Sequence, residues 1–185
     1  MSDYIRRARD FAQGVIAAPV SRFGLISVAI FILVIVVDQA SKAWVLYGLR
    51  LPSHPPVKIL PFFSFSYVEN TGMSFGILSG TWFGRWFLTL FQLAAAVCLG
   101  YGATKAKQPL PAIALSMIAG GAIGNAVDRI RFGSVVDFLD FSGTHVFPWV
   151  FNVADSAISI GVALLAWHFI RTDTADGQKA QDGAA

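Results

Sequence analysis

The chain has 185 residues, of which 55% are hydrophobic and only 14% are charged, and its formal net charge is +3. This composition is far more apolar than that of a soluble domain of this size, so it predicts a membrane protein. The cations are spread among the termini and short loops, which argues against nucleic-acid binding, and the single cysteine, Cys98, excludes an intramolecular disulfide framework.

Four segments have the character of membrane-spanning helices, and these are residues 23–49, 86–104, 110–127 and 146–170. A tight basic turn around Lys105 and Lys107 separates the second from the third, and Pro109 suits the first turn of a helix. We expect a single membrane domain over residues 22–171, with residues 1–21 as an N-terminal tail and residues 172–185 as a flexible C-terminal tail.

The distribution of basic residues predicts the orientation. With four spans, eight of the fourteen lysines and arginines fall on the side of the termini and six on the other. Because cytoplasmic loops carry an excess of Lys and Arg, both termini are predicted to be cytoplasmic. Trp82 and Trp86 would then lie at the outer end of the second helix, where aromatic rings favour the headgroup region.

Residues 51–80 have a different sequence pattern from the predicted helices. Four prolines disfavour helix there, and residues 63–67 alternate strictly between aromatic residues and serine. The pattern predicts a short pair of strands. An exposed strand edge there would pair with an extended peptide, or the strands would form a purely structural cap.

Burying a polar side chain inside a membrane span costs free energy, so such residues are candidates for a functional site. Asp38, Asn125 and Asp155 each lie 16 to 18 residues from a basic residue at the cytoplasmic end of their helix. At about 1.5 Å per residue these are rises of about 24 to 27 Å in a hydrocarbon core about 30 Å thick. The three side chains are therefore predicted at one depth, near the outer surface.

Two pairings are expected within the helices. Asp38 and Lys42 are four positions apart and share a helix face, so they form an ion pair that either orients the bundle or contacts substrate. Asp128 has Arg129 beside it and Arg131 nearby, which predicts an ion-paired scaffold residue. On the same helix, small residues recur every four positions and predict close helix packing, at Ser116, Gly120 and Gly124.

Peptide hydrolysis without a metal needs one carboxylate that deprotonates water and a protonated partner that polarises the carbonyl. Asp137 lies between Val136 and Phe138, which disfavours its charged form, whereas Asp155 begins a helix whose dipole favours an anion. These opposed biases suit a pair that shares a proton. The alternative for Asp155 is an ordinary helix cap, and Asp140 is expected to be solvated.

Other chemistries have less support. The three histidines, His54, His145 and His168, are scattered and lack the spacing of zinc ligands on one helix. The chain has no Gly-x-Ser-x-Gly elbow for a serine nucleophile. The proposed chemistry requires no cofactor.

From about residue 22 to residue 171 the chain resembles the lipoprotein signal peptidase (signal peptidase II) family. Four ordered blocks carry the resemblance: Asp38-Gln39-Ala40-Ser41-Lys42; Asn70-Thr71-Gly72-Met73-Ser74-Phe75; Gly124 to Arg129 with Val135 to Phe138; and Phe151 to Ile158. Met73 and Ser74 stand where the family commonly carries smaller alanines, which affects local packing only.

The resemblance implies an all-α membrane protein with four transmembrane helices, a small extracytoplasmic β-cradle at about residues 51–80 and a short surface helix. It also implies a catalytic dyad of Asp137 and Asp155. By the same similarity, six residues would line the site or hold the substrate, and Asp38 and Lys42 would support it. The six are Asn70, Gly72, Asn125, Asp128, Arg129 and Asn152.

The expected function is that of an intramembrane aspartyl endopeptidase of the bacterial inner membrane. It would remove signal peptides from diacylglyceryl-modified prolipoproteins by cleavage just before the lipidated cysteine, acting as a monomer among membrane lipids. The alternative from another class is a small proton-coupled transporter, because membrane carboxylates also relay protons. A purely structural membrane subunit is the third possibility.

Overall fold

The computed structural model describes residues 20–72, 81–144 and 149–182, with side chains as far as Thr172. Most of these residues form four long helices: α2 (Gly24–Ala43), α3 (Trp82–Lys105), α4 (Pro109–Phe132) and α5 (Val153–Asp182). Each contains an apolar stretch long enough to cross a membrane, the first of which continues through Ser53. The described part of the chain is therefore a four-span membrane protein, as the composition predicts.

Three helix boundaries differ modestly from the sequence prediction. α2 passes into a π-helical turn, Trp44–Gly48. α3 begins four residues earlier than predicted, at Trp82, because the Thr81 hydroxyl caps it by accepting a hydrogen bond from Gly84 N at 3.0 Å. α4 runs on to Phe132 and ends at Gly133, whose φ of 87° is the left-handed conformation that stops helices.

The predicted start of the fourth helix at residue 146 is wrong. Residues 145–148 lie outside the described residues, and Val150–Phe151 form strand β4 instead of helix. Asn152 then caps α5, since its Oδ1 accepts from Asp155 N at 2.9 Å while its own N donates to Asp155 Oδ2 at 3.3 Å. This reciprocal pair fixes the helix start. At its other end α5 continues to Asp182, through residues expected to form a flexible tail.

The small sheet has four antiparallel strands in the order β1 (Val57–Leu60), β2 (Phe63–Asn70), β3 (Val135–Asp140) and β4. The first two are the strand pair predicted within residues 51–80. Strand β3 joins them from after α4, and its register sets Asp137 opposite Val68 and Val135 opposite Asn70. The sheet thus carries Asp137 itself.

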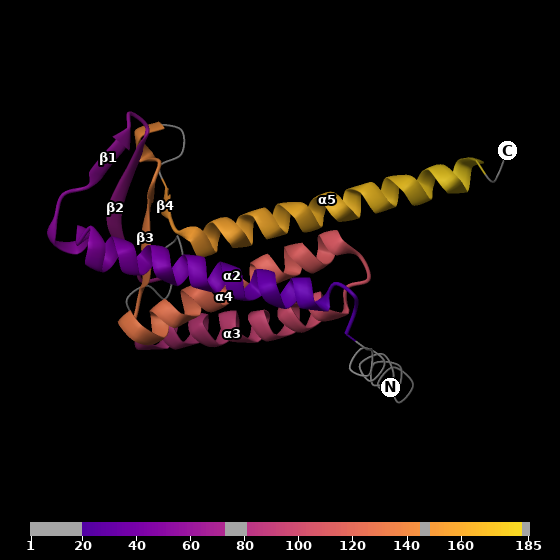
Figure 1. Ribbon diagram of the computed structural model, residues 1–185, viewed down its shortest axis with the longest axis horizontal. Helices are drawn as coiled ribbons and strands as arrows, with labels where there is room; N and C mark the ends of the chain where they lie inside the picture. Colours follow the sequence, from indigo (N-terminus) through magenta and orange to yellow (C-terminus); the bar gives the residue numbers. More distant parts are fainter. Residues whose placement is uncertain (1–19, 73–80, 145–148, 183–185) are drawn as a thin grey trace.

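Helix α4 lies between the other three helices, which Figure 1 shows running beside it. Small residues allow this close packing. A Cβ at Gly120 would lie 2.9 Å from the Phe31 carbonyl oxygen of α2, and a Cβ at Gly161 of α5 would lie 2.7 Å from the Ala114 carbonyl oxygen. The prediction of close helix packing through small residues is confirmed.

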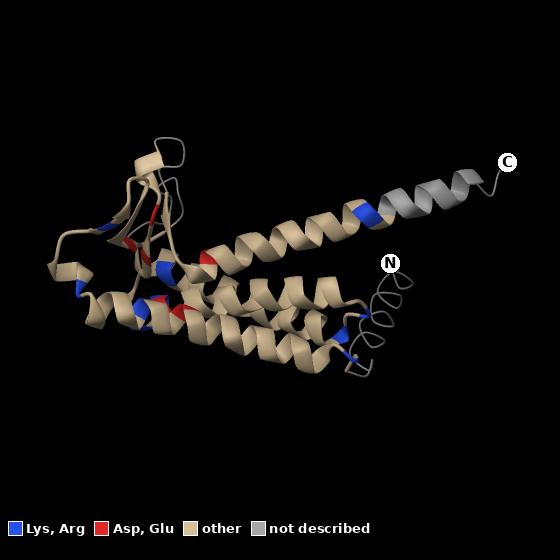
Figure 2. Cartoon of the chain, turned by 45° about the horizontal axis from the view of Figure 1, so that its top comes forward, with Lys and Arg blue, Asp and Glu red and all other residues tan. Residues whose placement is uncertain are grey.

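The sheet occupies one end of the bundle, here called the sheet end (Figure 1). At the opposite end α2 begins beside the close of α3, where Ser21 N donates to Thr104 O at 2.8 Å. Charged residues gather at the two ends, while the helix lengths between them are almost free of charge (Figure 2). This distribution is that of a bundle whose middle lies in hydrocarbon.

Candidate active site

Strand β3 and the first turn of α5 meet at one buried amide. Asn152 Nδ2 donates to Asp137 Oδ1 at 2.6 Å, and Asn152 Oδ1 accepts from the backbone N of Asp155 at 2.9 Å. Asp137 and Asn152 are buried, with 2% and 0% of their surface exposed. The two aspartates, 18 positions apart in the sequence, are therefore held against the same side chain.

Two further asparagines hold the free oxygens of this pair. Asn70 Nδ2, at the end of β2, donates to Asp137 Oδ2 at 3.0 Å, and Asn125 Nδ2 of α4 donates to Asp155 Oδ1 at 2.7 Å. Asn125 Oδ1 in turn accepts from Asn152 Nδ2 at 3.2 Å. Each carboxylate oxygen thus has an N–H donor, and every side-chain donor comes from a neutral amide.

Burial, and after it the negative charge of Asp155, together raise the pKa of Asp137 to about 6. Hydrogen bonds from Asn70 and Asn152 and the charge of Lys42 oppose the shift. An ordinary aspartate has a pKa of about 3.9. Asp137 therefore holds a proton at much higher pH than an exposed aspartate, as general acid–base chemistry with two carboxylates requires.

A buried charged cluster supports the amides. Lys42 Nζ lies 2.9 Å from Asp38 Oδ2 and 2.8 Å from Asp128 Oδ2, and it donates to Asn125 Oδ1 at 3.2 Å. The side chains of the three charged residues are 3%, 0% and 1% exposed. The bond to Asn125 connects the cluster to Asp155.

The same two anions anchor the elements that carry Asp137 and Asp155. Asp38 Oδ1 accepts from Ala154 N at 2.9 Å, and Asp128 Oδ2 accepts from Val136 N at 3.1 Å. Each bond ends on the residue directly before an aspartate of the pair. Asp38 and Asp128 are thus placed to fix the backbone of α5 and β3 at the site.

The predicted partner of Asp128 was wrong. Its ion pair is with Lys42 of α2, while the neighbouring Arg129 donates through Nη1 to Gln92 Oε1 at 2.9 Å. Adjacent residues on a helix point to different faces, so a neighbour in sequence is a poor ion-pair partner. The predicted pair of Asp38 and Lys42, spaced by four, is confirmed.

The model of the signal peptidase (SPase) II family matches residues 30–171 of the chain. The chain belongs to the signal peptidase II family. The lipoprotein signal peptidase of Caulobacter vibrioides is 44% identical over 147 residues, which cover 79% of this chain and 87% of that relative. The lipoprotein signal peptidase of Rhodopseudomonas palustris is 41% identical over 141 residues, which cover 74% of this chain and 86% of that protein.

A solved structure described as "Bacterial membrane enzyme structure by the in meso method at 2.3 A resolution" is similar in fold. Its TM-score is 0.70 at 28% identity, over 86% of this chain and 94% of that one. Membership of the signal peptidase II family makes the chain a protease, and its four apolar helices make it a multi-pass protein of the bacterial inner membrane.

Gln39 belongs to the first block of the resemblance to signal peptidase II, but no role was predicted for it from the sequence. The side chain inserts between α2 and α4, where Nε2 lies 3.1 Å from Asp38 Oδ2, 3.1 Å from Gly124 O and 3.0 Å from Asp128 Oδ1. It is a neutral donor shared by both anions of the cluster. Gln39 could have been identified from the sequence, because it is a polar residue next to Asp38 within an apolar span.

Arg129 is buried on the α3 side of the candidate site, and its positive charge is attracted to Asp155, Asp137 and Asp128. Arg85 of α3, which sequence reasoning did not single out, holds the end of α4 by donating to the carbonyl oxygens of Arg129 and Ile130 at 2.7 and 2.8 Å. A cation on the last carbonyls of a helix stabilises its C-terminus.

The remaining predicted residue with a described position is Gly72. Its backbone N donates to Asn70 Oδ1 at 3.3 Å, which helps orient the amide that contacts Asp137. Met73 and Ser74, from the same block, lie outside the described residues. The hydrogen bonds and ion pairs above connect nine residues of the candidate site: Asp38, Lys42, Asn70, Gly72, Asn125, Asp128, Asp137, Asn152 and Asp155.

Proposed function

We propose that the chain is an aspartyl endopeptidase that removes signal peptides from diacylglyceryl-modified prolipoproteins, cleaving just before the lipidated cysteine. The observation that carries this proposal is the pair of Asp137 and Asp155 on the shared amide of Asn152. The names of the relatives support the substrate class. Family membership favours this peptidase over a proton-coupled transporter.

In the proposed mechanism, one aspartate of the dyad takes a proton from a water molecule as that water attacks the scissile carbonyl. The other aspartate, protonated, donates to the carbonyl oxygen and stabilises the tetrahedral intermediate. The pKa of about 6 supports a proton on Asp137 under mildly acidic conditions. Collapse of the intermediate breaks the C–N bond, and the amine of the cysteine leaves with a proton from the dyad.

The remaining site residues have supporting roles in this proposal. Asn70, Asn125 and Asn152 hold the dyad, and the charged cluster of Lys42 with its two aspartates fixes the backbone beneath it. Arg129 and Gly72 would line the path of the substrate. The enzyme requires no cofactor and acts as a monomer, because one chain supplies both aspartates.

The proposed orientation puts both termini in the cytoplasm and the sheet end at the extracytoplasmic surface. The excess of basic residues on the side of the termini supports it. A lipid-anchored cysteine would then rest at the outer membrane surface, level with the dyad. Cysteine accessibility labelling in intact cells tests this orientation, using single cysteines placed at Lys58 of β1 and Lys107 in a Cys98→Ser background.

Cleavage assays test the catalytic assignment. Purified enzyme is mixed with a diacylglyceryl-modified prolipoprotein, and product size is followed by gel electrophoresis. Asp137→Asn and Asp155→Asn should each lower the rate by at least about a thousandfold, since either change removes one member of the acid–base pair. Asp140→Asn is the matched control on the same strand, because Asp140 bonds Ser142 N at 2.9 Å and not the site. Undiminished cleavage by either dyad variant refutes the assignment.

A further inference from the structure

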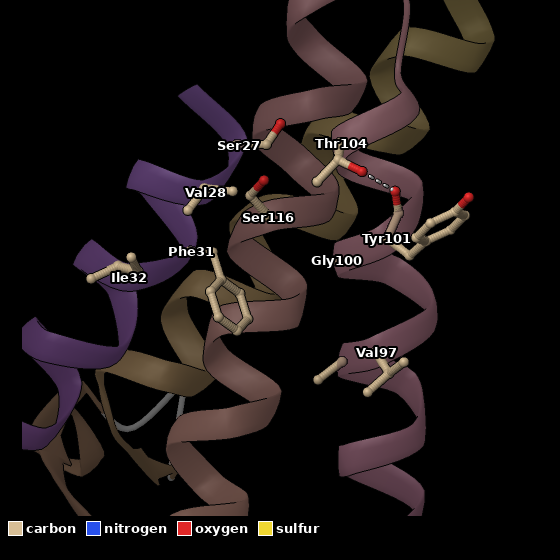
Figure 3. A pocket seen from close by; sticks show the side chains of 10 residues that line it. Ser27, Val28, Phe31, Ile32, Val97, Gly100, Tyr101, Thr104 and Ser116 are labelled. Carbon is tan, nitrogen blue, oxygen red and sulfur yellow. Dashed lines mark hydrogen bonds between the residues drawn. The ribbon is translucent and has the colours of Figure 1, made fainter. Parts of the chain in front are cut away.

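A cavity lies among the membrane-spanning helices, away from the candidate active site. It is a groove of about 370 Å³ between α2 and α3, with α4 as its floor. Figure 3 shows Val28, Phe31 and Ile32 on the α2 side, with Val97 and Gly100 on the α3 side. Its volume is at the lower end of the range for small-ligand pockets, and no residue of the dyad or of the charged cluster lines it.

The polar side chains in the groove already bond to the protein. Ser27 Oγ donates to Ala103 O at 3.0 Å, and Ser116 Oγ donates to Ala112 O at 2.7 Å. Thr104 Oγ1 donates to Tyr101 O at 2.8 Å, the bond drawn in Figure 3. These hydroxyl hydrogens are therefore committed to backbone carbonyls. The walls are predominantly hydrocarbon, which suits an apolar occupant and gives water few partners.

The groove opens toward the surroundings of the bundle. Val28, Ile32 and Val97 at its rim are 44%, 52% and 70% exposed. All three lie in membrane-spanning helices, so the medium at the opening is lipid hydrocarbon. An empty groove would leave its lining atoms without dispersion partners. An acyl chain of a neighbouring lipid has the chemistry to fill it.

Two basic residues lie beside one end of the groove, although neither lines it. Tyr101 and Thr104 line that end, and Lys105 Nζ lies 5.1 Å from the centre of the Tyr101 ring. Arg22 precedes α2 at the same end of the bundle, because Ser21 N bonds Thr104 O at 2.8 Å. Two cations therefore stand where the helices leave hydrocarbon, a position that favours the phosphate of an anionic lipid.

We propose that this groove is a binding site for an anionic phospholipid, with one acyl chain between α2 and α3 and the phosphate near Arg22 and Lys105. The apolar walls of the groove and the two cations beside its end match the two parts of such a lipid. The site is separate from the dyad, and its existence does not depend on the proposed peptidase function.

Native mass spectrometry of the full chain tests the site. The protein is delipidated in mild detergent and titrated with phosphatidylglycerol or with phosphatidylcholine of the same acyl chains. The wild type should retain one phosphatidylglycerol more tightly than phosphatidylcholine, by about 25-fold, because each of the two nearby cations is expected to contribute about fivefold. Arg22→Gln and Lys105→Gln should each remove about fivefold of this preference.

Gly100→Leu fills the groove and should abolish tight binding of both lipids. Gly102→Leu is the matched control on the same helix, because its Cβ points at Leu115 and the residue does not line the groove. If Gly100→Leu does not fold, Val97→Trp blocks the groove from its rim instead. Retention by the blocked variant equal to that of the wild type overturns the site, and equal retention of the two lipids by the wild type overturns the anionic headgroup. Displacement of the lipid by stoichiometric prolipoprotein also overturns the proposal, since the groove would then bind substrate.

Discussion

Asn152 joins Asp137 and Asp155, donating to the Oδ1 of the first at 2.6 Å and accepting from the backbone N of the second at 2.9 Å. The residue that caps α5 is thus also the residue that positions the proposed dyad. Helix initiation and the geometry of the site depend on one side chain.

Asn152 variants should separate these two roles. Asn152→Ala removes the cap and the donor to Asp137, so we expect a loss of about 1 to 2 kcal/mol in unfolding free energy and a fall in cleavage rate of about a hundredfold or more. Asn152→Asp keeps a capping oxygen but places a third carboxylate beside two others. It should retain more stability than the alanine variant and still lose activity. Equal cleavage by Asn152→Asp and wild type would contradict this role.

Stability should depend on pH through Asp137. Its pKa is about 6 in the folded protein and about 3.9 when unfolded, so the folded state binds the proton more tightly. The contribution of the Asp137 proton to the free energy of unfolding is fully present below about pH 4. It is lost as pH rises through about 6, and the total loss is about 3 kcal/mol. Asp137→Asn should lack this loss, so its stability relative to wild type should increase between pH 4 and 7. Unfolding in detergent at several pH values measures the difference, and parallel pH curves for the two proteins would exclude it.

Lys42→Met should be strongly destabilising. It leaves Asp38 and Asp128 buried without their shared cation, and breaking a buried pair in this way costs about 3 to 5 kcal/mol. The double variant Lys42→Met with Asp38→Asn should recover part of that loss, because one uncompensated charge is removed. Lys58→Met on the exposed strand β1 is the control and should change stability by less than about 0.5 kcal/mol. Additive effects of the two cluster changes would contradict the coupling.

Gly124→Ala should disrupt the contact between α4 and α2. A Cβ there would lie 2.5 Å from Asp38 Oδ2, so the anion that holds α5 must move, at a cost of about 1 to 3 kcal/mol with reduced cleavage. Gly102→Ala is the matched change, since its Cβ would meet Leu115 at an ordinary 3.7 Å. It should be neutral or stabilising, because alanine favours helix. Thermal unfolding of the two variants side by side distinguishes a steric effect from a general effect of replacing glycine.

The meeting of α2, α4 and α5 at one depth could be predicted from sequence. Helical rise is constant, so counting from the basic ends puts Asp38, Asn125 and Asp155 level, and bonds now connect Asp38 to the first turn of α5 and Asn125 to Asp155. The spacing of four likewise predicted the ion pair of Asp38 and Lys42. These predictions needed only local geometry.

Predictions that depended on tertiary contacts failed or were not made. Strand β3 is buried at Val135, Val136, Asp137 and Phe138, so its sequence lacks the alternation that reveals a half-buried strand. The start of α5 was placed too early because apolar strand residues resemble the start of a span. The partner of Asp128 comes from another helix, 86 positions earlier in the sequence, and no local rule selects it.

The bond from Ala154 N to Asp38 Oδ1 connects residues 116 positions apart, one in the first span and one in the last. During biosynthesis the first span leaves the ribosome well before the last, and Asp155 follows Ala154 directly. The proposed acid–base pair can therefore be assembled only after the fourth span has been made. On the proposed assignment, a chain that ends before the fourth span lacks proteolytic capacity, so the membrane is not exposed to a partly built hydrolase.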